Sequence, residues 1–263
     1  MKRILCLILL TFTMLSMSVD DYTLINSIRF DPSVSFTTDK LGNVFVITEN
    51  QLLEFNAAGK PLANFSRTNL GELRSIDASN PLKIVLFYPA FAQIVLLNNK
   101  LSETSTIQLR NSGVNQPIVV CNSENEGYWI YDREDDQLKK LDLNLQIVNQ
   151  SGNLTAATGY SLLPNFLCEG NNNVYVNDPR FGIFVFDRYG TYYKLIPVKD
   201  LKSFQVVDRN IIYLRDNQIF RYDTKTIEDK EILLPPHGRL SGGRIEQQQL
   251  YLLTSDSLNF YSF

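Results

Sequence analysis

Histidine is almost absent from this chain, which argues against several classes of enzyme. The single histidine, His237, follows two prolines and precedes a glycine, so we expect an ordinary exposed loop imidazole there and not a catalytic base. The GxSxG, HExxH, P-loop and EF-hand spacings do not occur either. The sequence therefore predicts a protein that is not an enzyme and that binds no cofactor.

Cysteine is also scarce, with three residues in the chain. Cys121 and Cys168 each lie at the end of an apolar, strand-like run, and neither has the CxxC spacing or the histidine partners of a metal site. They occupy matching points of neighbouring repeats, where the backbones are expected to stand farther apart than the ~7 Å between Cα atoms that a disulfide allows. Buried free thiols are therefore expected, with a disulfide as the alternative.

Long apolar runs are missing except at the start of the chain. Lys2-Arg3 precede an apolar run from Ile4 to Leu15, and residues 16–18 have the small-x-small spacing that a signal peptidase recognises. Residues 1–18 are predicted to be a signal peptide, and residues 19–263 the mature chain. No later segment approaches the ~20 apolar residues of a membrane helix. We therefore expect a protein outside the cytosol, with no direct membrane insertion.

Charge is balanced, with a net value of −3. Lysine and arginine are not clustered as they are on a nucleic-acid-binding surface, so no nucleic-acid partner is expected. One acidic run, from Glu124 to Asp136, is followed at once by Lys139-Lys140. It is interpreted as a solvated hairpin, with a charged contact patch as the alternative.

What the chain has in quantity is strand-forming residues. Val, Ile, Leu, Phe and Tyr come in runs of about five, separated by Asn, Asp, Gly and Ser, and no long 3.6-residue periodicity follows the leader. One unit is repeated most clearly: residues 39–46 with 52–59 are similar to residues 172–176 with 182–190. The sequence therefore predicts an all-β protein built from repeats.

The repeat length selects the architecture. An apolar residue at the centre of each unit's second strand recurs at intervals of 38 to 46 residues, at Phe45, Val85, Trp129, Tyr175, Tyr213 and Tyr251. A period of about 40 residues with short strands is typical of propeller blades. Six such positions predict one domain, a six-bladed β-propeller. In the sixth unit, Arg244–Glu246 are expected as the first, inner strand.

The two ends of the chain predict how the ring closes. The sixth unit stops at Leu258–Phe263, a third strand with no fourth strand after it, and Tyr22–Phe30 is a strand with no blade before it. We expect the N-terminal strand to complete the last blade, because this pairing removes a free sheet edge and joins the two ends of a repeat array.

Polar residues near the ends of five inner strands could point into the central channel. Oxygen ligands from several strands are what Ca²⁺ requires, and the candidates are Asp39, Asp77, Asn122, Glu169 and Asp208. The preferred interpretation is that these residues form the tight turns after the strands, so no metal is predicted. Calcium binding belongs to the alternative function given below.

A hairpin in the second unit is less polar than a loop in water is expected to be. Residues 89–92 carry one aromatic residue, Phe91, and two alanines. Phe91 and its neighbour Tyr88 are therefore predicted to contact a protein partner, since buried aromatic residues carry much of the energy of interfaces.

The two clearest units resemble the NHL-type propeller repeat, with Gly42-Asn43-Val44-Phe45-Val46 and the closing Gly59 in the first. In the fourth, Val174-Tyr175-Val176 and the closing Gly190 match it. This resemblance implies the architecture and no particular activity.

A second block, Leu70–Tyr88 with Gln93–Leu101, resembles a family of exported propeller proteins of Bacteroidota that includes the plug subunit of the type nine secretion translocon. The resemblance implies a periplasmic protein that closes the periplasmic end of an outer-membrane β-barrel translocon protein. The function expected is thus a non-enzymatic interaction subunit. The alternative is a six-bladed propeller hydrolase, or small-ligand binder, with Ca²⁺ in the channel.

Overall fold

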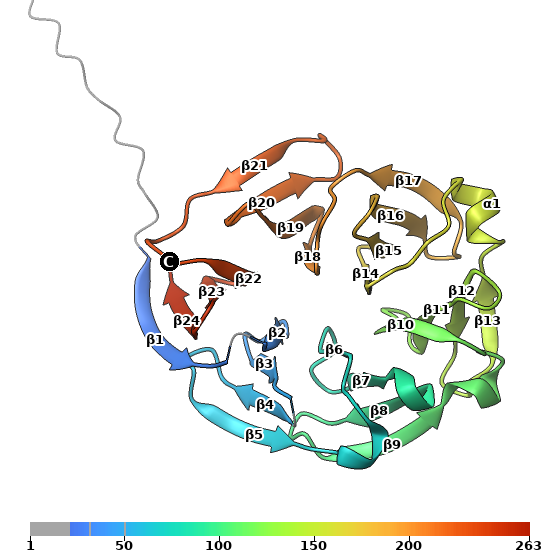
Figure 1. Ribbon diagram of the computed structural model, residues 1–263, viewed down its shortest axis with the longest axis horizontal. Helices are drawn as coiled ribbons and strands as arrows, with labels where there is room; N and C mark the ends of the chain where they lie inside the picture. The colour runs from blue at the N-terminus through green and yellow to red at the C-terminus, as the bar shows by residue number, and fades with distance from the viewer. Residues whose placement is uncertain (1–21, 32, 50) are drawn as a thin grey trace, which may run out of the picture.

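The computed structural model describes residues 22–31, 33–49 and 51–263 of the chain. Six four-stranded antiparallel sheets are arranged in a ring, so the protein is a six-bladed β-propeller, as predicted (Figure 1). The predicted signal peptide, residues 1–18, lies outside the described residues. Within the described part of the chain, no helix is long and apolar enough to span a bilayer.

Each blade runs from an inner to an outer strand in chain order. The first three blades are β2 (Ser35–Thr38), β3 (Val44–Ile47), β4 (Leu52–Phe55) and β5 (Pro61–Phe65); β6 (Ser75–Asp77), β7 (Ile84–Tyr88), β8 (Gln93–Leu97) and β9 (Glu103–Gln108); β10 (Pro117–Asn122), β11 (Tyr128–Asp132), β12 (Gln137–Leu141) and β13 (Ile147–Gln150). The next two blades are β14 (Phe166–Gly170), β15 (Asn173–Asp178), β16 (Gly182–Asp187) and β17 (Tyr192–Ile196); β18 (Phe204–Val207), β19 (Asn210–Arg215), β20 (Gln218–Asp223) and β21 (Asp229–Ile232). A short helix, α1 (Leu154–Thr158), precedes the fourth blade.

The sixth blade is made from both ends of the chain. Its inner three strands are β22 (Leu240–Glu246), β23 (Gln249–Thr254) and β24 (Ser257–Ser262), and its outer strand is β1 (Thr23–Arg29). β1 pairs antiparallel with β24, from Thr23 opposite Ser262 to Arg29 opposite Ser257. The predicted closure is confirmed, and it leaves the ring without an open blade.

The core lies between adjacent blades. The six repeat-defining residues all stand on second strands and are at most 2% exposed. Trp129 packs in one cluster with Phe184 of the next blade, and Phe45 in another with Leu86 of the next. Because second and third strands are covered on both faces, apolar residues predominate in them, and β3 (Val44–Ile47) is apolar throughout. Apolar side chains that pack across the boundary between two blades in this way fix the position of each blade.

A buried ion pair lies where the sequence predicted a solvated hairpin. Asp132, the last residue of β11, has a fully buried side chain, and Lys139 Nζ lies 2.7 Å from its Oδ2. The backbone amides of Asn115 and Gln116 donate to the same carboxylate at 3.0 and 2.9 Å. Although burial opposes ionisation, these bonds hold the pKa of Asp132 below its usual value. The prediction was wrong for this part of the acidic run, because Asp132 is needed to bind the linker that enters the blade.

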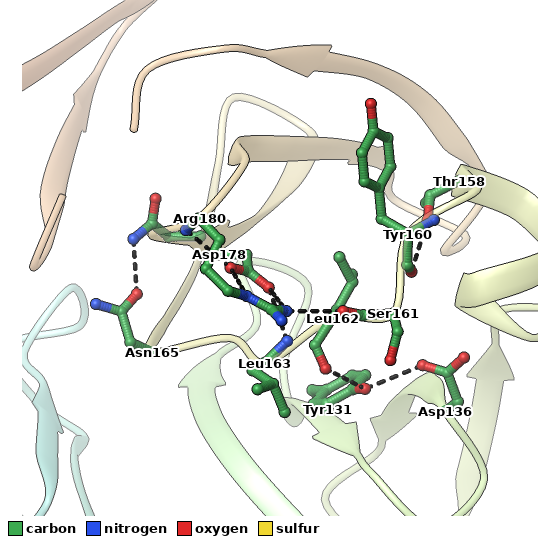
Figure 2. A network of polar contacts seen from close by, with 11 residues as sticks. Tyr131, Asp136, Thr158, Tyr160, Ser161, Leu162, Leu163, Asn165, Asp178 and Arg180 are labelled. Atoms are coloured by element: carbon green, nitrogen blue, oxygen red, sulfur yellow. Dashed lines mark hydrogen bonds and ion pairs between the residues drawn. The ribbon is translucent and has the colours of Figure 1, made fainter. Parts of the chain in front are cut away.

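The linker into the fourth blade is held in the same way (Figure 2). Asp178, the last residue of β15, is buried and accepts a hydrogen bond from the amide of Leu163 at 2.7 Å. Arg180 Nη2 lies 2.6 Å from the same carboxylate and 2.7 Å from the carbonyl oxygen of Ser161. An aspartate that ends a second strand therefore fixes the incoming linker in two successive blades.

Glu54 is a buried carboxyl group in the first blade. Its side chain, on β4, is 3% exposed, and its Oε2 is buried without a hydrogen-bond partner among the described residues. Burial and the nearby carboxylate of Asp39 raise the pKa of Glu54 to about 7. Folding therefore favours the protonated form of this residue.

We expect the stability of the protein to fall as the pH rises from about 5 to about 7.5, because the folded state binds the Glu54 proton more tightly than the unfolded state does. The loss should approach 2 to 3 kcal/mol, and Glu54→Gln should remove it. Urea denaturation at a series of pH values measures this difference. Glu72→Gln, on an exposed residue, is the control, and equal pH dependence in both variants would contradict the assignment.

Candidate functional site

The six inner strands surround a channel that opens into a cavity at each end. The last residues of all six inner strands border the first cavity, which has a volume of about 800 Å³: Thr38, Asp77, Asn122, Gly170, Val207 and Glu246. The inner strands therefore run in the same direction around the channel. The second cavity, of about 1080 Å³, is bordered by residues near the starts of several of these strands, among them Ser35 and Ser75.

The two cavities carry opposite charge. The first, called the acidic mouth here, is lined by five carboxylates and by Lys40 and Arg244; the carboxylates are Asp77, Glu124, Glu169, Asp208 and Glu246. The second, called the basic mouth, is lined by Glu49 and Glu72 and by four cations, Arg67, Arg74, Lys202 and Arg244. The channel is thus polarised along its axis, and Arg244 borders both ends.

Four of the five residues considered as calcium ligands line the acidic mouth, and Asp39 does not. Asp39 is buried in its turn, where its Oδ1 accepts hydrogen bonds from the amides of Leu41 and Asn43 at 2.9 and 2.8 Å. Asp77 likewise accepts from two backbone amides, at 2.7 Å each. The contacts of Asp39 and the one from Ser79 to Asp77 lie within turns, as the preferred interpretation expects, whereas the amide of Asn122 belongs to the neighbouring blade. Within the described residues, no group of three or more His, Cys, Asp or Glu side chains is placed to hold a metal ion.

Three polar atoms in the wall of the acidic mouth have no hydrogen-bond partner among the described residues. They are Asn122 Oδ1, Ser123 Oγ and Glu169 Oε1, and each belongs to a side chain that is at most 8% exposed. The other oxygen of Glu169 accepts from the amide of Glu124 at 2.8 Å, which fixes the carboxylate in place. Each of these three atoms has less than 1 Å² of accessible surface, so they are enclosed in the wall between β10 and β14 and do not face the cavity.

Arg244 is the residue that the sequence analysis missed. It lies on β22 and borders both cavities, and its guanidinium makes no hydrogen bond or ion pair with any described residue. Burial lowers the pKa of Arg244, and Glu246, two residues away, partly opposes that effect. Charged residues inside an inner strand, at positions 244 and 246, were the signal that could have identified it.

Cys121 and Cys168 are free thiols, as expected, but Cys121 is buried and Cys168 is partly exposed. Cys168 lines the acidic mouth next to Glu169. Burial raises the pKa of each thiol well above its usual value, and a thiol in this state is a poor nucleophile. His237 lies between β21 and β22, is half-exposed, and borders neither cavity.

The two predicted contact residues differ in exposure. Phe91 ends a 3-10 turn, Pro89–Phe91, and its side chain is 47% exposed. Tyr88 is 2% exposed and packs with Leu70 and Leu97, so its prediction as a surface contact was wrong. Both faces of β7 are covered, so the side chain of its last residue is buried as well.

The face around the acidic mouth carries one exposed apolar residue on each blade. In an antiparallel blade, the loop after the first strand and the loop after the third lie at the same end, and these loops hold Leu41, Leu82, Leu143, Tyr189 and Ile227. Phe263 follows β24, the third strand of the sixth blade, at the same end. These six residues, 40 to 73% exposed, are called the apolar ring below. Phe91 belongs to the opposite face, because its turn joins a second strand to a third.

Comparison with known proteins supports the architecture. No family model and no curated protein matches the sequence. Among solved structures, a catalytically inactive virginiamycin B lyase from Staphylococcus aureus, with quinupristin, is similar at 12% identity and a TM-score of 0.63, over 92% of this chain and 100% of that one. The WD40 domain of Pan2 from Neurospora crassa is similar at 10% identity and a TM-score of 0.59, over 94% and 97%. BamB from Moraxella catarrhalis is similar at 10% and 0.54, over 92% and 98%. At these identities the similarity shows the propeller fold alone.

Proposed function

We propose that this protein is a non-enzymatic interaction subunit of the periplasm that closes the periplasmic end of an outer-membrane β-barrel translocon, as the plug of the type nine secretion system does. The observation that carries the proposal is the apolar ring. Its six residues are spread over all six blades at one face, so this face offers an exposed apolar contact on every blade to a partner with a circular outline. The signal peptide predicted at residues 1–18 and the sequence block at residues 70–88 and 93–101 support the same location and partner.

An enzymatic role has less support. The virginiamycin B lyase that shares the fold is inactive as a histidine-to-alanine variant. The single histidine here, His237, borders neither end of the channel. The channel carboxylates Asp77 and Glu169 are engaged by backbone amides, which favours a structural role for them.

Native isolation from solubilised outer membranes tests the proposal. We expect a large barrel protein to be recovered with the full chain, and Leu41→Asp with Leu82→Asp to reduce its recovery about tenfold or more, because each charge would be buried at the contact. Leu62→Asp is the matched control, since Leu62 is 53% exposed on the outer strand β5 and is not part of the apolar ring.

Two results would contradict this assignment. Recovery of no barrel protein by the full chain would remove the plug function. Loss of the barrel on Phe91→Asp, with normal recovery by the double variant, would keep the function and move the contact to the opposite face, where Phe91 was predicted to act.

A further inference from the structure

The linker into the second blade is not held as the linkers into the third and fourth blades are. In those two blades, a buried aspartate at the end of the second strand accepts hydrogen bonds from linker amides. The second strand of the second blade, β7, ends instead at Tyr88, which has no carboxylate. Among the described residues, no group accepts a hydrogen bond from the amides of Glu72 and Leu73, just before β6. Two backbone donors at this linker are therefore available to a ligand.

This linker forms one wall of the basic mouth. The basic mouth extends as a groove between the first and second blades, from Phe65 at the end of the outer strand β5 to Lys202 near the channel axis. The two blades are neighbours in the ring (Figure 1). The groove is also lined by side chains that cover the core but are only half-buried, namely Ile47, Phe65, Leu73 and Ile76. It therefore combines apolar surface with free main-chain donors.

The charge of the groove favours an acidic ligand. Four cations line the basic mouth against two carboxylates. Arg67 is paired with Glu103, but Arg74 and Lys202 are exposed and make no ion pair with any described residue. At the other end of the channel, five carboxylates line the acidic mouth. An acidic chain is therefore attracted to the groove and is repelled from passing through the ring.

We propose that this groove binds an extended, acidic segment of a partner polypeptide. The acidic side chains of the segment pair with Arg74 and Lys202, and its apolar side chains lie on the half-buried apolar residues. Its main-chain carbonyl groups accept hydrogen bonds from the amides of Glu72 and Leu73. A helical segment is a poorer match, because a helix uses most of its carbonyl groups internally. A nucleic acid is also a poorer match, because the two carboxylates of the groove repel phosphates and the surface between the charges is apolar.

The groove and the apolar ring lie on opposite faces of the propeller. The loop between β3 and β4 and the linker before β6 both line the groove, and both lie where second strands end. Phe91 belongs to this face, and its turn approaches the linker, because a Cβ at Gly71 would lie 3.5 Å from Ala90 Cβ. The groove therefore stays open when the apolar ring contacts a barrel, and this inference does not depend on the proposed function.

Isothermal titration calorimetry with the purified protein tests the proposal. The probe is a hexapeptide with blocked ends that alternates glutamate and leucine. In the extended form it spans about 20 Å, more than the ~14 Å across the four strands of a blade. It is expected to bind about tenfold or more tightly than two control hexapeptides, a difference of about 1.4 kcal/mol. One control alternates lysine and leucine, and the other alternates glutamate and serine.

Matched variants locate the binding site. Arg74→Glu and Lys202→Glu should each weaken binding of the glutamate–leucine peptide by about fivefold or more, because each removes an attraction and adds a repulsion. Lys100→Glu is the control, since Lys100 is an exposed lysine in the loop after β8, at the other face. It should leave the affinity within about twofold.

Four results would overturn the proposal. They are no binding of the glutamate–leucine peptide, equally tight binding of either control peptide, tighter binding of a single-stranded oligodeoxythymidine of the same length, and equal weakening by Lys100→Glu and the two groove variants. Loss of barrel recovery with normal peptide binding would remove the plug function alone. Loss of peptide binding in the groove variants with normal barrel recovery would support two separate contact faces.

Discussion

Replacing Asp132 by alanine is expected to destabilise the protein by about 3 to 5 kcal/mol, because it leaves Lys139 buried without its main partner. The side chain of Lys139 is 4% exposed, and its Nζ lies 2.7 Å from Asp132. The change also leaves the amides of Asn115 and Gln116 without their acceptor, which adds a cost of about 1 kcal/mol or more for each amide that water does not reach. Urea denaturation followed by tryptophan fluorescence measures the loss, since Trp129 is on the same strand.

Two variants give this prediction its controls. Asp135 also pairs with Lys139, but its side chain is 43% exposed, so Asp135→Ala should cost less than about 1 kcal/mol. Lys139→Met in the Asp132→Ala background should restore part of the stability, because it replaces the unpaired buried charge with an apolar side chain of similar length. A loss below about 1 kcal/mol for Asp132→Ala would show that the pair is not a structural anchor.

The fold was predictable because the physical signals that specify it are local and repeated. Phe45, Trp129 and Tyr175 each sit at the centre of a strand covered on both faces, and the regular interval between such positions corresponds to one blade. The closing strand was predictable for a different reason. A third strand with no fourth at one end of the chain, and an unmatched strand at the other, leave one antiparallel pairing that removes both open edges.

Side-chain burial at strand ends was less predictable. Tyr88 was predicted to contact a partner because it is an aromatic neighbour of Phe91 in the sequence, yet it is the last residue of β7 and packs inward. Asp132 was assigned to a solvated hairpin because charged residues surround it in the sequence. Its burial depends on the amides of Asn115 and Gln116, which lie in the linker before the blade and not in the charged run around Asp132.

The channel site was the least predictable part. Which inner-strand residues face the axis is set by the packing of neighbouring blades and not by the pattern of one strand. β22 illustrates this point, since it begins at Leu240 and not at Arg244 as predicted. Gly242 and Gly243 let it approach its neighbours, because a Cβ at Gly243 would lie 2.3 Å from Ile219 Cδ1. The strand therefore extends through both glycines, and Arg244 lies inside it and not at its start.

Deleting residues 22–30 is expected to have an effect at least as large, because it opens the ring. β1 covers β24, whose Leu258 and Phe260 are fully buried, and Phe30 packs edge-to-face against Phe55 of the first blade at 6.0 Å. The deletion removes the apolar contacts of several half-buried side chains and exposes an unpaired edge. With about 1.5 to 3 kcal/mol for each side chain when fully buried, the loss should exceed about 3 kcal/mol, a large part of the total stability of a domain.

Thermal unfolding by circular dichroism measures this loss, and size-exclusion chromatography detects pairing between exposed edges. A synthetic peptide of residues 22–30 added in trans should restore the melting temperature, because it can pair with β24 as an added strand, whereas a scrambled peptide should not.

Point variants guard against a deletion that fails to fold. Ile28 packs into the core, and Arg29 points to solvent, so Ile28→Asp should destabilise the full chain by about 2 kcal/mol or more and Arg29→Asp by less than about 0.5 kcal/mol. Equal stability of the deleted and full chains would show that the other five blades and the remainder of the sixth hold the ring without this strand.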